Sequence, residues 1–143
     1  MSAEENKALV RRWVELWNEK NIPAVNDFVA QDYVRHDPNA PAVYGPEAEK
    51  ELIATYLDAF PDLHFTIEDL VTEDDKVAAR LTARGTHQGE LLGIPATQRQ
   101  ITVPMIETYR LADGKIAEQW VVMDVLGMLQ QLGAIPSPGQ ANT

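Results

Sequence analysis

The chain of 143 residues contains no cysteine. This excludes disulfides, thiolate metal ligands and a cysteine nucleophile. Only two serines are present, Ser2 and Ser137, and their place in the terminal segments argues against a serine nucleophile. The three histidines are scattered and lack the spacing of metal ligands. We therefore expect a protein that works without a metal ion or another cofactor.

Positive charge and long apolar runs are also scarce. The net charge of −10 and the isoelectric point near 4.6 argue against nucleic acid or an anionic membrane surface as a partner. No apolar run reaches the ~20 residues of a membrane span. The first residues lack the basic start and apolar core of a signal peptide. We expect a cytoplasmic protein that binds neither nucleic acid nor membrane.

The overall composition is typical of one globular domain. Hydrophobic residues make up 45% of the chain and charged residues 24%. A chain of this length can bury a substantial core. We expect a single domain over residues 1–135. Residues 136–143 contain prolines, a glycine and small or polar residues, and are expected to be disordered.

Apolar residues recur at helical spacing in the first part of the chain. The pattern predicts helices over residues 3–20, 23–30 and 46–60. Residues 32–36 are expected to form a short strand. The segment 37–45 is expected to be a loop because of its prolines and its glycine.

From residue 63 onward the hydrophobic period changes to two, which is typical of strands. Four antiparallel strands and a final short helix are expected, over residues 63–71, 77–87, 101–111, 116–123 and 124–133. Helices followed by antiparallel strands indicate an α+β fold.

Glu107 is a carboxylate where the alternation of its strand asks for an apolar side chain. The more apolar face of that strand consists of Ile101, Val103, Met105, Glu107 and Tyr109. A buried carboxylate resists ionisation, so its pKa rises toward the range useful for proton transfer. Glu107 is either a general acid or base, or a structural acid paired with Tyr109, an arginine or a second copy of the chain.

Three further side chains are candidates for the site. His87 ends the apolar face of the preceding strand and either shares a proton with Glu107 or positions the glycine-rich segment. His36 precedes a proline-containing loop and either reaches the interior or faces solvent. Asp124 is a candidate catalytic acid, although its place before the last helix favours an N-cap.

Two stretches resemble the SnoaL-like polyketide cyclases. Residues 85–97 are similar to the hinge segment of that family, and residues 113–133 to its C-terminal signature. Residues 14–18 and 60–63 fit the same pattern, so the resemblance covers residues 4–133. It implies the nuclear transport factor 2-like fold, in which a cone-shaped, curved antiparallel sheet wraps around N-terminal helices. It also implies a deep apolar cavity and a homodimer.

The resemblance also places the family's site on this chain. The aspartate that acts as acid and base in the family's cyclases falls at Val121, and a pocket histidine falls at Glu107. The chain thus lacks the cyclase aspartate but has a titratable group one strand away. The residues expected to contact a ligand in the cavity are Trp17, His36, Tyr56, Phe60, Met105, Tyr109, Gln119, Trp120 and Val121.

The function predicted from these features is binding of a small apolar or polyketide-like metabolite. With catalysis, the expected reaction is a cofactor-free cyclisation of the aldol type or an isomerisation. Glu107 would move the proton, and His87 with Gln119 or Tyr109 would hydrogen-bond the enolate oxygen. One alternative is a non-catalytic binding dimer, which Val121 favours. Another is epoxide hydrolysis, for which the inward positions offer no obvious arginine.

Overall fold

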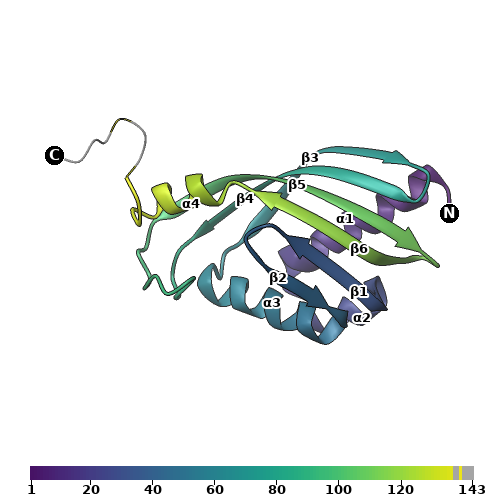
Figure 1. Cartoon of the computed structure of the whole chain (residues 1–143), viewed down its shortest axis with the longest axis horizontal. Coiled ribbons are helices and arrows are strands. Elements are labelled where there is room, and N and C mark those ends of the chain that lie inside the picture. The colour runs from purple at the N-terminus through teal and green to yellow at the C-terminus, as the bar shows by residue number, and fades with distance from the viewer. Residues whose placement is uncertain (137–138, 140–143) are drawn as a thin grey trace.

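A computed structural model describes residues 1–136 and residue 139 of the chain (Figure 1). Most of the tail that the sequence predicts to be disordered therefore lies outside the described residues. No helix in the described part of the chain is long and apolar enough to cross a membrane.

Most of the helices lie in the first part of the chain, and one short helix follows the last strand. The helical elements are α1 (Ala3–Glu19), the 3-10 helix η1 (Ile22–Ala24), α2 (Val25–Phe28), α3 (Gly45–Ala59) and α4 (Val125–Gln131). Helix α1 begins at a capping box, in which the Ser2 hydroxyl accepts from the Glu5 backbone and the Glu5 carboxylate accepts from the Ser2 backbone. It ends at Lys20, which adopts the left-handed conformation.

One curved sheet of six strands forms the other layer (Figure 1). Its strands are β1 (Val29–Asp37), β2 (Ala40–Tyr44), β3 (His64–Glu73), β4 (Lys76–Thr86), β5 (Gln100–Ala112) and β6 (Lys115–Met123). They lie in the order β2-β1-β6-β5-β4-β3. Helix α1 contacts β3 and β4, whereas α3 contacts β1 and β2. The predicted α+β class is confirmed.

The sheet differs from the prediction at its first two strands. Residues 40–44, expected in a loop, form β2 and pair antiparallel with β1. Strand β2 is an edge strand, where Pro41 does not interrupt a ladder on both sides. Strand β1 pairs with β6 in parallel, so the sheet is mixed rather than purely antiparallel. The second predicted helix ends at Phe28 because β1 begins directly after it.

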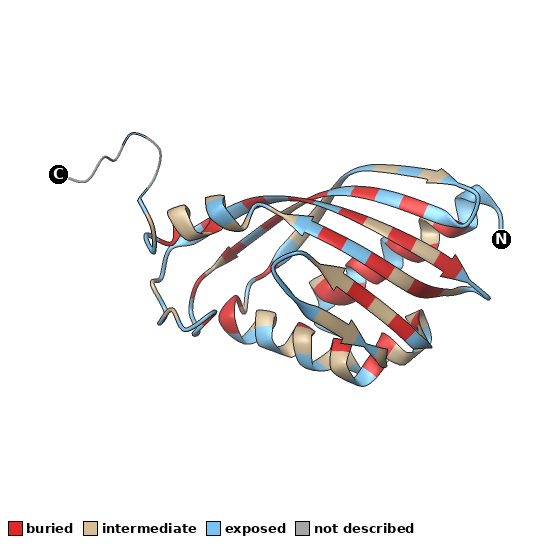
Figure 2. Cartoon of the chain, viewed as in Figure 1, coloured by how far each residue is buried: buried red, intermediate tan, exposed pale blue. Residues whose placement is uncertain are grey.

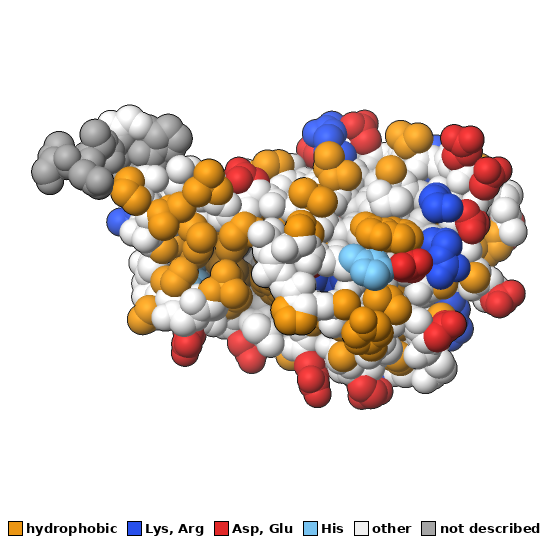
Figure 3. Space-filling model, in the orientation of Figure 1, with side chains coloured by type: hydrophobic (Ala, Val, Ile, Leu, Met, Phe, Trp, Pro, Cys, Tyr) orange, Lys and Arg blue, Asp and Glu red, His pale blue; other side chains and the backbone are white. Residues whose placement is uncertain are grey.

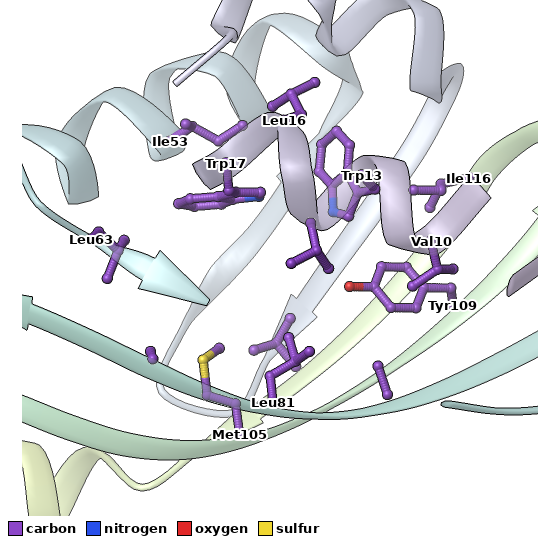
Figure 4. Close-up of a cluster of buried hydrophobic side chains, with 14 of the residues drawn as sticks. Val10, Trp13, Leu16, Trp17, Ile53, Leu63, Leu81, Met105, Tyr109 and Ile116 are labelled. Atoms are coloured by element: carbon purple, nitrogen blue, oxygen red, sulfur yellow. The ribbon is translucent and has the colours of Figure 1, made fainter. Parts of the chain in front are cut away.

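Strand β5 lies between β4 and β6 and shows the strict burial alternation that the sequence predicts (Figure 2). Its inward side chains meet the apolar face of α1. Figure 4 shows Trp13 and Trp17 of α1 on one side of this core, with Leu81, Met105 and Tyr109 of the sheet on the other. Glu107 lies between Met105 and Tyr109 on this inward face, so it enters the core from the middle of the sheet.

Candidate functional site

Glu107 is almost completely enclosed, with 7% of its surface exposed. Its neighbours in register are Ala79 on β4 and Val121 on β6, which are both small and apolar. The hydroxyl of Tyr109, two residues along the same face, donates a hydrogen bond to the Glu107 carboxylate. Burial raises the pKa of Glu107, and the Tyr109 hydroxyl and the Arg35 charge oppose this effect only in part.

Arg35 supplies a positive charge to the same interior. It lies on β1 two residues after Tyr33, and both side chains are buried on the inner face of the sheet. Its guanidinium lies 3.9 Å from the Asp37 carboxylate, measured from Nη1 to Oδ2. The Arg35 Nε has no hydrogen-bond partner among the described residues. An inward arginine that the sequence did not reveal is therefore available at the site.

Glu49 is a second buried acid and comes from the opposite layer. It lies on the side of α3 that also buries Pro46 and Ile53, and its own surface is fully enclosed. Neither of its carboxylate oxygens has a hydrogen-bond partner among the described residues. Burial raises the pKa of Glu49 to about 7, although the Arg35 guanidinium lowers it.

A cavity opens between the sheet and the helices next to these groups. Its walls are mainly aromatic, aliphatic and thioether side chains, and its two charged groups are Arg35 and Glu107. The full lining consists of Trp17, Arg35, Tyr56, Phe60, Leu63, Phe65, Ala83, Ile101, Val103, Met105, Glu107, Met123 and Met128. The space that centres of water molecules can occupy is about 40 Å³. This holds a few water molecules and is smaller than the deep cavity expected from the resemblance.

Five of the predicted site residues come together on this wall. They are Trp17, Tyr56, Phe60, Met105 and Glu107. Three others are buried behind the wall. Tyr109 bonds Glu107, Val121 lies beside Glu107 in register, and Gln119 accepts a hydrogen bond of 2.8 Å from the Tyr33 hydroxyl.

His87 does not share a proton with Glu107. Its backbone N–H donates to the carbonyl of Arg99, eight residues before Glu107 along the chain, and its side-chain hydrogen bonds are to Thr97. The ring is fully buried against Phe60, and the Thr97 N–H donates to its Nδ1 at 3.2 Å. His87 holds the segment between β4 and β5 in place, which is the structural alternative that the sequence left open.

His36 and Trp120 lie outside the cavity, contrary to the prediction. The His36 side chain is 40% exposed, and its Nε2 lies 2.6 Å from the Glu118 carboxylate. Its ring stacks on Trp120, with 5.5 Å between ring centroids. The short strand that carries His36 runs parallel to β6 in a register that pairs His36 with Trp120 and sends both to the outer face. Arg35, one residue earlier, faces inward instead.

Asp124 caps a helix and takes no part in the cavity. It is exposed, and its carboxylate accepts a hydrogen bond of 2.8 Å from the Gly127 backbone N–H at the start of α4. The N-cap that its position favoured is confirmed, and the side chain lies outside the cavity wall that carries Glu107. The cap fixes the N-terminal end of α4. Met128 of the same helix lines the cavity.

Replacing Asp124 by alanine is expected to lower the free energy of unfolding by about 1 kcal/mol, because the Gly127 N–H loses its acceptor. Urea unfolding of the purified variant measures this effect. Asp124→Asn is the matched control, since an asparagine side chain also caps helices. If Asp124→Ala and Asp124→Asn unfold at the same urea concentration as the unchanged protein, the cap contributes nothing.

The sequence contained a signal for each of the two residues that it did not single out. Arg35 is in phase with the aromatic Tyr33, but the opposite face of the predicted strand carries Val34, so the alternation did not decide which face is inward. Glu49 precedes Ile53 by one helical turn and therefore belongs to the apolar side of its helix. Only the tertiary packing puts Arg35 on the cavity wall with Glu107 and puts the helix that carries Glu49 against β1.

A curved sheet with helices packed on it, and a small cavity lined by one acid and one arginine, defines a class of small α+β proteins. Within that class, the family model described as SnoaL-like polyketide cyclase matches residues 7–132. The chain belongs to the SnoaL-like polyketide cyclase family.

Relatives and solved structures agree with this membership. The aklanonic acid methyl ester cyclases DauD of Streptomyces sp. (strain C5) and DnrD of Streptomyces peucetius are each 34% identical over 131 residues. These matches cover 87% of this chain, with 80% of DauD and 88% of DnrD. The crystal structure of AclR from Streptomyces galilaeus, provisionally assigned as a hydroxylase, matches with a TM-score of 0.85 at 32% identity. That match covers 95% of this chain and 85% of AclR.

Proposed function

We propose that this protein catalyses a cofactor-free cyclisation of the aldol type on a polyketide-like ester. The observation that carries the proposal is the Glu107 carboxylate, which lines an apolar cavity beside the Arg35 guanidinium. Relatives that are cyclases of aklanonic and nogalonic acid methyl esters support this class of substrate. The site differs from the family's machinery in its acid, since Val121 occupies the aspartate position and lies next to Glu107 in register.

The reaction needs one group that removes and returns a proton. Glu107 takes a proton from the carbon beside a carbonyl, and that carbon becomes part of an enolate. The enolate carbon then forms a C–C bond with a second carbonyl carbon, whose oxygen receives the electron pair and takes the proton from Glu107. Burial raises the pKa of Glu107 and thereby makes it a stronger base than an exposed glutamate.

Arg35 stabilises the enolate in this reaction, in place of the His87 and Gln119 groups expected from the sequence. It is the cationic group on the cavity wall, and its Nε has no hydrogen-bond partner among the described residues, so a ligand oxygen can accept from it. A guanidinium fixed in an enclosed apolar site stabilises a developing negative charge strongly. Tyr109 holds the Glu107 carboxylate in position from behind the wall.

The cavity has to widen before a polyketide-like ester can enter. Pockets for ligands of that size measure about 300–1,000 Å³, far more than the space present. Met105, Met123 and Met128 line it, and unbranched thioether side chains repack readily. Figure 3 shows hydrophobic side chains gathered over the end of the molecule that carries α4 and the segment before β5. We place the entrance at this end.

The proposal is tested with aklanonic and nogalonic acid methyl esters as substrates in D₂O. The expected result is protein-dependent formation of the cyclised product without added cofactor, together with deuterium incorporation at the carbon that loses its proton. Mass spectrometry measures both, and heat-denatured protein is the control. Binding of the esters without cyclisation or exchange above the buffer rate would instead support the non-catalytic binding protein.

The homodimer implied by the resemblance stays a prediction.

Epoxide hydrolysis is a second candidate function, because the structure supplies the inward arginine that the sequence did not show. Glu49 and Glu107 both lie close enough to influence the Arg35 charge. In this reaction Glu107 removes a proton from water, the water oxygen attacks an epoxide carbon, and the C–O bond breaks to an alkoxide that takes the proton back from Glu107. Formation of a diol that carries ¹⁸O from labelled water would favour this candidate over cyclisation.

A further inference from the structure

Two buried carboxylates lie on the elements that flank Arg35: Glu49 on α3, which packs against β1, and Glu107 on the cavity wall that Arg35 also lines. Glu107 comes from β5 in the sheet, Glu49 comes from α3, and Arg35 on β1 carries the charge that both experience. Arg35 and Glu107 line the cavity, whereas Glu49 does not belong to its wall. Glu49 therefore cannot be assigned to substrate contact, and its burial needs another explanation.

The two acids differ in the hydrogen bonds that their carboxylates accept. Glu107 accepts a hydrogen bond from Tyr109, while neither oxygen of Glu49 has a hydrogen-bond partner among the described residues. The Tyr33 hydroxyl beside Glu49 would favour the ionised form if it donated to this carboxylate, but its single proton goes to Gln119. An ionised carboxylate that is fully enclosed and lacks donors is costly. The proton of the pair therefore belongs on Glu49.

We propose that Glu49 is a positioning residue for Glu107: it holds a proton, and its ionisation withdraws the Arg35 charge from Glu107 and from the ligand. The proposal rests on the proposed function only where it concerns turnover. The coupling itself is a property of the folded protein. While Glu49 is neutral, the Arg35 charge stabilises the negative charge on Glu107 and on the enolate oxygen. Once Glu49 is ionised, it competes with Glu107 for the guanidinium charge, in addition to the Asp37 carboxylate that lies 3.9 Å from Arg35.

The surroundings of Glu49 determine at which pH the change occurs. The titratable and charged groups that face this cluster are Tyr33, Arg35 and Asp37 on β1, Tyr56 on α3, and Glu107 and Tyr109 on β5. Burial, and to a smaller extent the Glu107 charge, raise the pKa of Glu49 to about 7, against the lowering effects of the Arg35 charge and the Tyr33 hydroxyl. The ionisation of Glu49 thus falls near neutral pH, where it changes the site under ordinary conditions.

Carboxyl ¹³C NMR of glutamate-labelled protein tests the coupling without a substrate. The unchanged protein should show a glutamate that titrates near pH 7, and this step should disappear in Glu49→Gln. Because coupling is reciprocal, the same step should move down by about one pH unit in Glu107→Gln. Glu51→Gln, an exposed change on the same helix, should leave it unmoved. A step near pH 7 that survives Glu49→Gln, or that Glu107→Gln does not move, overturns the proposal.

Two further measurements separate this proposal from the proposed function. The free energy of unfolding of the unchanged protein should fall relative to that of Glu49→Gln as the pH rises from 4.5 to about 7 and then level off, because the folded state holds the Glu49 proton in this range and the unfolded state does not. Turnover of the unchanged protein should decline above pH 7, and Glu49→Gln should retain it there. If the NMR coupling is present but no turnover is found, the proposed function fails and the coupling stands. If turnover is found without coupling, the role of Glu49 fails.

Discussion

Replacing Glu107 by glutamine is expected to lower kcat for cyclisation by about 10²- to 10⁴-fold, the usual contribution of a general acid or base. Glutamine has nearly the same shape, and its amide oxygen can still accept from the Tyr109 hydroxyl, so the fold should be retained. The proton, however, has no acceptor. Deuterium exchange into the substrate should fall in parallel with turnover, because both require the same proton removal.

The pH dependence provides a second test of the same residue. Burial raises the pKa of Glu107, so kcat of the unchanged protein should rise with pH as this carboxylate loses its proton. Glu107→Gln should lack this rising limb. Glu68→Gln is the matched control, since Glu68 is an exposed glutamate on β3. Turnover and exchange that are equal in Glu107→Gln and Glu68→Gln would remove Glu107 from the mechanism and favour a binding protein.

Replacing Arg35 by methionine is expected to lower the free energy of unfolding at pH 8 by about 3–5 kcal/mol. This is the usual effect of removing one partner from a set of buried, oppositely charged groups. Methionine fills similar space without charge. Glu49 and Glu107 then lose the cation that opposes the effect of burial on their pKa. Since both pKa values rise further, stability is lost as the pH increases, and the loss should be smaller at pH 5, where the two acids carry protons.

Arg80→Met is the matched control for this change. Arg80 lies on the outer face of the sheet, its Nε is 2.8 Å from the Asp69 carboxylate, and the two side chains are 55% and 61% exposed. Exposed ion pairs contribute at most about 1 kcal/mol, so the control should unfold close to the unchanged protein at both pH values. Chemical unfolding followed by circular dichroism measures all three proteins. An Arg35→Met effect no larger than that of Arg80→Met at pH 8 would show that Arg35 does not balance the buried acids.

Local patterns predicted much of this structure because they depend on neighbouring residues. The apolar repeat of residues 3–20 identified α1 almost to the residue, since helical spacing is a short-range property. The alternation around Glu107 identified an inward acid because side chains on a strand change faces at every residue. The same reasoning did not succeed for residues 32–45. There, an edge strand tolerates a proline, and strand β1 can present either face until it pairs with β6.

The candidate site was predicted in part for the same reason. Glu107 and four aromatic or sulfur-containing residues that line the cavity with it belong to patterns that are visible in single segments; the four are Trp17, Tyr56, Phe60 and Met105. His87, His36 and Asp124 also lie in clear segments, yet their direction depends on contacts with Thr97, Trp120 and Gly127. Each of these contacts holds its side chain in a structural role away from Glu107.

The sequence by itself determined that an acid occupies the inward face of a central strand in an α+β domain, and which family that domain resembles. Only the tertiary structure decided what this acid meets. Arg35 and Glu49 lie far from Glu107 along the chain, and the parallel pairing of β1 with β6 and the packing of α3 on β1 bring their charges within reach. Secondary structure follows local periodicity, whereas the electrostatic balance of a buried carboxylate depends on groups that distant segments carry to it.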